Sequence, residues 1–164
     1  MDLDIRRGGT ELIGELEPLW LELHAHHQKV APQWRYHGDA ESWRIRSERY
    51  REWLAEPDAF VLVASIGDQL AGYALVHFKA GLDDSWVTGE RMAELETISV
   101  SPEYRGQGIG TALMDAVDAE LDRLGVDDLF IGALAGNEDA QRFYASRGLR
   151  PIMVHLARLG ASPC

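Results

Sequence analysis

The stretch from Ile98 to Thr111, I-S-V-S-P-E-Y-R-G-Q-G-I-G-T, constrains the fold of this chain more than any other. It begins as a strand, turns at Ser101-Pro102-Glu103, and places three glycines where a long helix should start. A helix N-terminus has unpaired backbone N–H groups and the positive end of the helix dipole, so it attracts anions. Glycine lets a phosphate approach the backbone closely, and Arg105 could pair with that phosphate. The stretch therefore predicts a pyrophosphate-binding turn.

Three kinds of phosphate-binding turn use such glycines, and the spacing separates them. A nucleotide P-loop ends in Gly-Lys-Ser/Thr, but Gly110-Thr111 lacks the lysine. The dinucleotide fingerprint needs G-x-G-x-x-G, whereas Gly106, Gly108 and Gly110 give G-x-G-x-G. The third pattern, R-x-x-G-x-G, is met from Arg105 onward and resembles the acyl-CoA loop of the GNAT acetyltransferase superfamily. A helix start with a few capping glycines is the plain alternative, and the turn alone does not name its ligand.

A second motif runs from Asn137 to Leu149, N-E-D-A-Q-R-F-Y-A-S-R-G-L. Asn137, Ala140 and Tyr144 stand at positions i, i+3 and i+7, so they share one face of a helix that Asn137 would cap. The motif resembles the N-x-x-A-x-x-F-Y-x-x-x-G-F segment of GNAT proteins, with Leu149 in place of the final Phe. Both motifs have that family's order and separation, and the resemblance extends from Phe60 to the end of the chain.

The resemblance implies an α/β (α+β) GNAT fold, in which residues 1–164 form a single domain. Its central sheet would be mixed and mostly antiparallel, with six to seven strands and helices on both faces. Hydrophobic patterning predicts strands over 2–6, 60–66, 70–79, 93–100 and 128–134, and a last strand or strand pair over 149–159. It predicts helices from Thr10 with an interruption at Pro18, over 40–56 and 106–124, and after Asn137. On the second helix, arginines alternate with glutamates, which favours a solvated, ion-paired face over an anion site: Arg44, Arg46, Arg49 and Arg51.

The resemblance also implies where acetyl-CoA, as co-substrate, would bind. The strand ending at Val100 would splay from the strand that starts near Asp128, and the acyl-CoA would occupy the gap. The backbone of Ile98, Ser99 and Val100 would hold the pantetheine arm, which Asn137 would also contact. The pyrophosphate would bind the turn formed by Arg105, Gly106, Gln107, Gly108, Ile109, Gly110 and Thr111.

Acyl transfer from a thioester to an amine places three demands on the site. The amine, with an ordinary pKa of ~10, must lose a proton. The carbonyl oxygen needs stabilisation as charge builds on it, which a backbone N–H near Val100 could provide. The departing thiolate is better released when it is protonated. Tyr144, near the sulfur by resemblance, is our candidate for the proton donor.

Glu94 and Glu96 are the candidates for the base, because they share strand parity with Ile98 and Val100. Glu96 is closer to the thioester end and is the first choice, with Glu94 as the second. Both could instead line an acidic substrate pocket without moving protons, and a bulge in the strand would break the parity argument. His24, His26, His27 and His77 are undecided between ligand or base roles and packing.

Net charge, apolar runs and cysteine content limit the kinds of partner and metal site that we expect for this chain. A net charge of −11 disfavours nucleic acid and anionic membranes and would suit a cationic amine, although solubility alone also explains it. No stretch approaches the ~20 apolar residues of a membrane span and no basic start precedes an apolar run, so we expect a cytoplasmic protein. The one cysteine, Cys164, is terminal, so neither a zinc site nor any other metal site is expected.

The resemblance carried by the two motifs implies an acyl-CoA-dependent N-acyltransferase that moves an acetyl group to a primary amine, on a small molecule or a peptide. Cys164 matches no catalytic position of the family, and Ser99 has no histidine beside it, so no nucleophile for a covalent acyl-enzyme is evident. Direct attack in a ternary complex is therefore expected. The alternative is a GNAT-like domain that senses acyl-CoA without turnover. The resemblance also suggests a homodimer.

Overall fold

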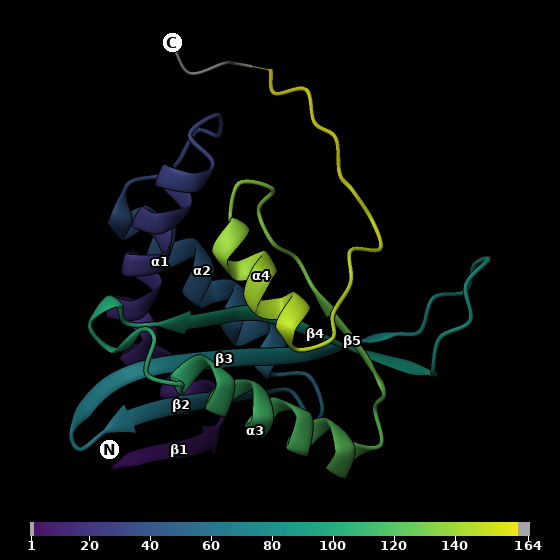
Figure 1. Ribbon diagram of the computed structural model, residues 1–164, viewed down its shortest axis with the longest axis horizontal. Coiled ribbons are helices and arrows are strands. Elements are labelled where there is room, and N and C mark those ends of the chain that lie inside the picture. Colours follow the sequence, from purple (N-terminus) through teal and green to yellow (C-terminus); the bar gives the residue numbers. More distant parts are fainter. Residues whose placement is uncertain (1, 161–164) are drawn as a thin grey trace.

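The computed structural model describes residues 2–160 and has a central sheet with the strand order β1-β2-β3-β4-β5 (Figure 1). The strands are β1 (Leu3–Gly8), β2 (Phe60–Ile66), β3 (Gln69–Ala80), β4 (Arg91–Val100) and β5 (Asp128–Ile131). The first four pair antiparallel in sequence order, and only β4 and β5 pair parallel. The mixed, mostly antiparallel sheet is confirmed, but within residues 2–160 it has five strands rather than six to seven.

The segment 149–159, expected to be a further strand, accounts for part of this difference. It leaves the last helix as an extended chain that pairs with no strand among the described residues (yellow in Figure 1). Its alternating apolar residues Ile152, Val154 and Leu156 are 71%, 78% and 93% exposed. The alternation is typical of a strand, but a strand also needs a partner, and the described residues supply none for this segment.

Helices cover both faces of the sheet. One face carries the 3₁₀ turn η1 (Thr10–Leu16), α1 (Glu17–Val30) and α2 (Asp39–Leu54), and the other carries α3 (Ile109–Leu124). Side chains of β2 and β3 alternate between the two cores because of the strand pleat. Val61 and Tyr73 lie in the core beneath α2, while Phe60 and Ala74 lie in the core beneath α3. Burial on both faces explains the continuous apolar run of β2.

Two predicted helix ends can be checked directly. α3 ends at Gly125, which adopts the left-handed conformation (φ +68°) as a C-cap. α4 (Glu138–Ser146) begins at Asn137, whose side-chain oxygen accepts a hydrogen bond from the Ala140 N–H at 3.4 Å. At the other end of the chain, Gly9 rather than Thr10 precedes the first helical turn. None of the helices within residues 2–160 has the length and apolar character needed to cross a bilayer.

Candidate active site

The strands β4 and β5 pair along the first half of β4 and then separate. Their pairing runs from Met92↔Asp128 to Leu95↔Ile131 and then stops. The Ser101 N–H donates to the Ala71 carbonyl of β3 at 2.8 Å, and backbone groups alternate in direction along a strand. The N–H and C=O groups of Ile98 and Val100 therefore point away from β3, toward the side that β5 has left. This edge pairs with no strand among the described residues, although its Val100 carbonyl accepts a hydrogen bond from Arg105. It lies in the gap that the resemblance implies for the pantetheine arm.

The glycine-rich turn lies at the end of that edge and leads into α3. Gly106 (φ +74°) and Gly108 (φ +86°) are left-handed, and a Cβ at either would meet nothing within 4 Å. Among residues 2–160, no group accepts a hydrogen bond from the N–H of Gly106, Gln107 or Gly108. The first N–H groups of α3 also lack intrahelical partners. The turn thus presents free donors, open space and a positive helix end, which suit a pyrophosphate.

Side chains within the turn hold its shape. The Arg105 Nε donates to the Val100 carbonyl at 3.0 Å, and the Gln107 amide donates to the Glu103 carbonyl at 3.2 Å. Ile109 is buried in the core beneath α3, so only its backbone is available to a ligand. Gly110 and Thr111 continue into the first turn of α3, where Thr111 is exposed. Arg105 is exposed, and within residues 2–160 its terminal guanidinium nitrogens have no acceptor, which leaves them available to a phosphate.

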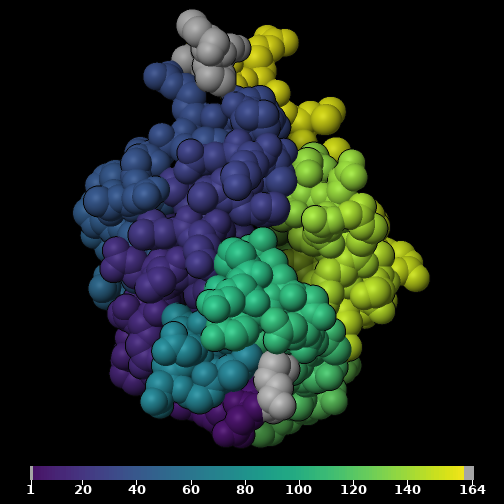
Figure 2. Space-filling view, turned by 60° about the vertical axis from the view of Figure 1, so that its left-hand side comes forward, coloured from purple at the N-terminus to yellow at the C-terminus, as the bar shows by residue number. Residues whose placement is uncertain are grey.

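A cleft of about 530 Å³ lies beside this edge, between α1, α2, β4 and α4. In Figure 2, α1 in purple-blue and α4 in yellow-green meet the green segment around the glycine turn on one face of the molecule. Residues from both ends of the chain line the cleft, among them Trp20, Leu23, His27, Trp34, Arg35, Tyr36, Arg46, Glu96, Thr97, Ile98, Asn137, Ala140 and Tyr144. A larger hollow of about 1100 Å³, lined by Glu56, Lys79 and Asp128, includes neither the glycine turn nor the unpaired edge.

Tyr144 contributes a phenol to the cleft. Asn137, Ala140 and Tyr144 all line it, so the predicted common helix face is confirmed. Within residues 2–160 the Tyr144 hydroxyl has no hydrogen-bond partner, and burial raises the pKa of this phenol to about 12. The hydroxyl therefore stays protonated at neutral pH and is available to a ligand as a donor.

The parity argument for the two glutamates is wrong, because β4 contains a bulge. The register with β3 shifts between Leu75↔Thr97 and Val76↔Leu95, which leaves Glu96 as an extra residue. After the bulge, Ile98 packs against the core beneath α3, whereas Glu96 points to the α2 side. Glu96 still lines the cleft, but it approaches from the opposite face of the sheet.

The carboxylate of Glu96 belongs to a three-residue chain of contacts. The buried ring of His77 places Nε2 at 2.8 Å from Glu96 and Nδ1 at 3.3 Å from Glu56. The indole of Trp53 stacks on the same ring with centroids 4.9 Å apart. The side chain of Glu96 is 18% exposed and that of Glu56 is 41% exposed. His77 thus joins a carboxylate in the cleft to a carboxylate at the surface.

Glu94 lies outside the cleft and forms an ion pair with Lys79. Possible metal-ligating atoms of His77, Glu94 and Glu96 lie within 4.8 Å of one another. Each already contacts a protein partner, since Glu94 holds Lys79 while His77 bridges Glu56 and Glu96.

The remaining candidate site residues are the histidines of α1 and Ser99, and they differ in whether they line the cleft or pack elsewhere. His24 is buried, stacks on Trp20 and contacts the His37 carbonyl at 2.9 Å, so it packs the α1 side. His26 contacts the Asn137 side chain at 3.3 Å. His27 lines the cleft, and burial, with the nearby His26 and Arg46 charges, lowers its pKa to about 4. The Ser99 side chain is buried away from the gap, with its hydroxyl 3.4 Å from the Leu19 carbonyl.

Sequence reasoning missed the aromatic and cationic part of the cleft. Arg46 was placed on an ion-paired face, yet it lines the cleft and has no carboxylate partner among the described residues. The signal was present, because Arg46 follows Trp43 by three residues and precedes Tyr50 by four. It therefore shares the face of α2 that packs inward. Trp20, Trp34, Arg35 and Tyr36 carried no such signal.

Comparisons with known proteins agree with this geometry. The family model described as the acetyltransferase (GNAT) family matches residues 20–149. An uncharacterized N-acetyltransferase of Mycobacterium tuberculosis is 31% identical over 118 residues, which cover 71% of this chain and 69% of that protein. The solved structure of a BH1408 protein mutant from Bacillus halodurans superposes with a TM-score of 0.78 at 20% identity, covering 95% of this chain and 99% of that one. An aminoglycoside N-acetyltransferase in complex with CoA gives a TM-score of 0.68 at 18% identity, covering 97% and 95%.

Proposed function

Because this chain belongs to the acetyltransferase (GNAT) family, we propose that it transfers an acetyl group from acetyl-CoA to a primary amine bound in the cleft. The observation that carries the proposal is that Tyr144 lines the same cleft as Ile98, which lies on the edge of β4 that β5 leaves unpaired. The open glycine turn follows directly at the end of that edge. The thioester supplies an activated acetyl group, and the residues of the chain bind it, orient it and move the protons.

The glycine turn and the β4 edge provide the binding half of the site. The free N–H groups around Gly108 hold the pyrophosphate, and the backbone of Ile98 and Val100 holds the extended pantetheine arm as a strand would. An N–H on this edge near Val100 also stabilises the negative charge that develops on the thioester oxygen. Fixed donors do this without reorganising, and one such donor contributes about 10²–10³ in rate.

Glu96 provides the base. An alkylammonium must lose its proton before it attacks, and Glu96 is the carboxylate that lines the cleft. His77 positions that carboxylate from behind, and Trp53 fixes the imidazole by stacking on it. A proton accepted by Glu96, directly or through a water, leads toward His77 and the surface carboxylate of Glu56.

Tyr144 provides the acid at the other end of the reaction. Its hydroxyl is protonated at neutral pH, since its pKa is raised to about 12. As the carbon–sulfur bond breaks, this hydroxyl donates to the departing sulfur, so that the thiol leaves in its protonated form. Direct transfer to the amine then needs no acyl-enzyme, in keeping with a cleft that holds no cysteine or serine among its described lining residues.

The Tyr144→Phe variant tests this assignment. The ring keeps its packing, and the missing hydroxyl breaks no hydrogen bond within residues 2–160, so fold and acetyl-CoA affinity should be retained. The turnover number should fall by ~10²–10⁴, the usual effect of losing a general acid. Single-turnover kinetics isolates the chemical step from product release. Unchanged single-turnover rates in the variant would remove Tyr144 from the mechanism.

A further inference from the structure

The charges that line the cleft differ in sign from the molecule that surrounds it. The chain carries a net charge of −11. Among residues 2–160, in contrast, the charged side chains that line the cleft are two arginines, Arg35 and Arg46, and one carboxylate, Glu96. With neutral histidine, its lining is therefore net positive. A positive cleft in an acidic protein favours a ligand with its own negative charge.

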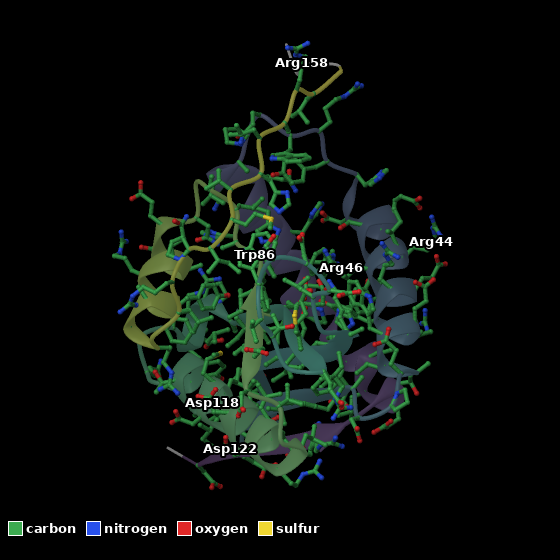
Figure 3. All side chains as sticks on the ribbon, turned by 90° about the vertical axis from the view of Figure 1, so that its right-hand side faces the viewer. Arg44, Arg46, Trp86, Asp118, Asp122 and Arg158 are labelled. Carbon is green, nitrogen blue, oxygen red and sulfur yellow. The ribbon has the colours of Figure 1, made fainter. Side chains whose placement is uncertain are left out.

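Arg46 is distinguished from the other arginines of α2. Arg44 pairs with Glu41 and Glu48, and Arg49 pairs with Glu52. Within the described part of the chain, Arg46 has neither an ion pair nor a hydrogen bond. Figure 3 shows Arg44 on the outer side of α2 and Arg46 on the inner side, toward the middle of the molecule.

Aromatic rings hold the Arg46 guanidinium in place. Its central carbon lies 4.2 Å from the ring centroid of Trp20 and 5.7 Å from that of Tyr50. Trp20 is itself fixed by a hydrogen bond from its indole N–H to Ser42, 3.0 Å long. Stacking uses the faces of a guanidinium and leaves the N–H groups at its edge free for a carboxylate or phosphate.

The two opposite charges thus stand in one small cleft. Glu96 is the base for the amine in the proposed function, and Arg46 and Glu96 line the same 530 Å³ of space. Both charges also act on the buried phenol of Tyr50. Burial raises the pKa of that phenol most, Arg46 lowers it, and Glu96 raises it further. The site is therefore complementary to a molecule with a cationic end and an anionic end.

We propose that the acceptor is a small amine that also carries a carboxylate or a phosphate, with Arg46 binding the anionic group while Glu96 receives the amine. This inference rests on the proposed acetyl transfer and names its substrate class. Arg35, on the loop between α1 and α2, adds a second cation at the exposed side of the cleft. A purely cationic amine would meet the unpaired Arg46 without a compensating charge, which disfavours polyamines despite the acidic surface of the protein.

The test compares amines in matched pairs that differ only in the anionic group. Amino acids of increasing chain length are paired with their carboxamides, and phosphoethanolamine is paired with ethanolamine. Amine-dependent thiol release gives kcat/KM for each member of a pair. The wild type should prefer the anionic member by about 10–100-fold, the usual range for a charge-assisted hydrogen-bonded pair.

Arg46→Met should remove this preference through KM, and Arg46→Lys should restore part of it. Arg44→Met on the outer face of the same helix should retain the preference, because Arg44 does not line the cleft and pairs with Glu41 and Glu48. A ratio within a pair is insensitive to a partial loss of folded protein, so it distinguishes recognition from a structural role. Equal rates for acids and amides in the wild type, or an unchanged ratio in Arg46→Met, would overturn the inference.

Failure of the inference can be told apart from failure of the proposed function. If neutral or polycationic amines are acetylated and anionic ones are not, the substrate class is wrong and acetyl transfer stands. If no amine in the panel is acetylated, acetyl transfer itself fails. Calorimetry with CoA-saturated protein then tests the substrate class. Binding of the anionic amines that is lost in Arg46→Met supports this class, and no such binding overturns it.

Discussion

Replacing Gly108 with leucine isolates ligand binding by the turn from its role in the fold. Gly108 is the N-cap of α3 at φ +86°, and a Cβ there would meet no atom within 4 Å. The substitution therefore creates no internal clash, and its cost to folding is the left-handed backbone conformation alone, about 1–2 kcal/mol. The added side chain occupies the open space in which we place the pyrophosphate.

Gly125 provides the matched control at the other end of α3. It is also left-handed, at φ +68°, and its Cβ would likewise meet nothing within 4 Å. Gly125→Leu should therefore lower the free energy of unfolding by a similar 1–2 kcal/mol. Acetyl-CoA at a hundredfold excess over its dissociation constant should stabilise the wild type by roughly 2.7 kcal/mol. For a domain of this size, that gain corresponds to about 5–10 °C in Tm.

Thermal unfolding of the three proteins, with and without acetyl-CoA, is the assay. Wild type and Gly125→Leu should both show the shift, whereas Gly108→Leu should show none while keeping its fold by circular dichroism. Calorimetric titration gives the same comparison as affinities. An acetyl-CoA shift that survives in Gly108→Leu, or that is absent from the wild type, would refute the assignment of the turn.

Three further outcomes are expected. Glu96→Gln should lower kcat/KM by ~10²–10⁴ with little change in acetyl-CoA affinity, whereas a rise in KM alone would show that Glu96 only lines the cleft; Glu94→Gln tests the second candidate in the same assay. Burial lowers the pKa of His27 to about 4 in the folded state, whereas it is ~6.5 in the unfolded chain. At a pH between these two values, the unfolded state therefore binds more protons than the folded state. The wild type should therefore lose about 2 kcal/mol of stability from this group between pH 6.5 and 4.5, and urea unfolding should show a smaller loss for His27→Gln. The exposed apolar row near Leu156 favours self-association, so sedimentation should give twice 18.3 kDa for the wild type and 18.3 kDa for Leu156→Asp; a wild type at 18.3 kDa would contradict this.

Much of the fold follows from local patterns in the sequence. β2 was predicted with its observed bounds, because an unbroken apolar run between polar turns is typical of a strand buried on both faces. The left-handed Gly108 and Gly125 mark the two ends of α3, as glycines at helix ends often do. Asn137 caps α4 and places Tyr144 in the cleft through helical periodicity alone.

Other parts depend on tertiary contacts that leave no local pattern. A bulge shifts the register by one residue without changing composition, so the sequence of β4 predicted the wrong face for Glu96 relative to Ile98. The alternation of arginines with glutamates on α2 favours ion pairs and masks the weaker signal that Arg46 shares the inward face of Trp43 and Tyr50. Its stacking on Trp20 is a tertiary contact that no local pattern predicts. The segment 149–159 alternates as a strand would, but pairing requires a second edge.

In the proposed reaction, an amine bound in the cleft attacks acetyl-CoA directly. The most direct test of this reaction measures free thiol and the intact mass of the protein together, with acetyl-CoA alone and with the amine panel. Thiol release is expected only when an amine is present, with one acetylated amine for each thiol and an unmodified protein mass throughout. A protein that gains an acetyl group from acetyl-CoA alone, or thiol release that no amine accelerates, would contradict it.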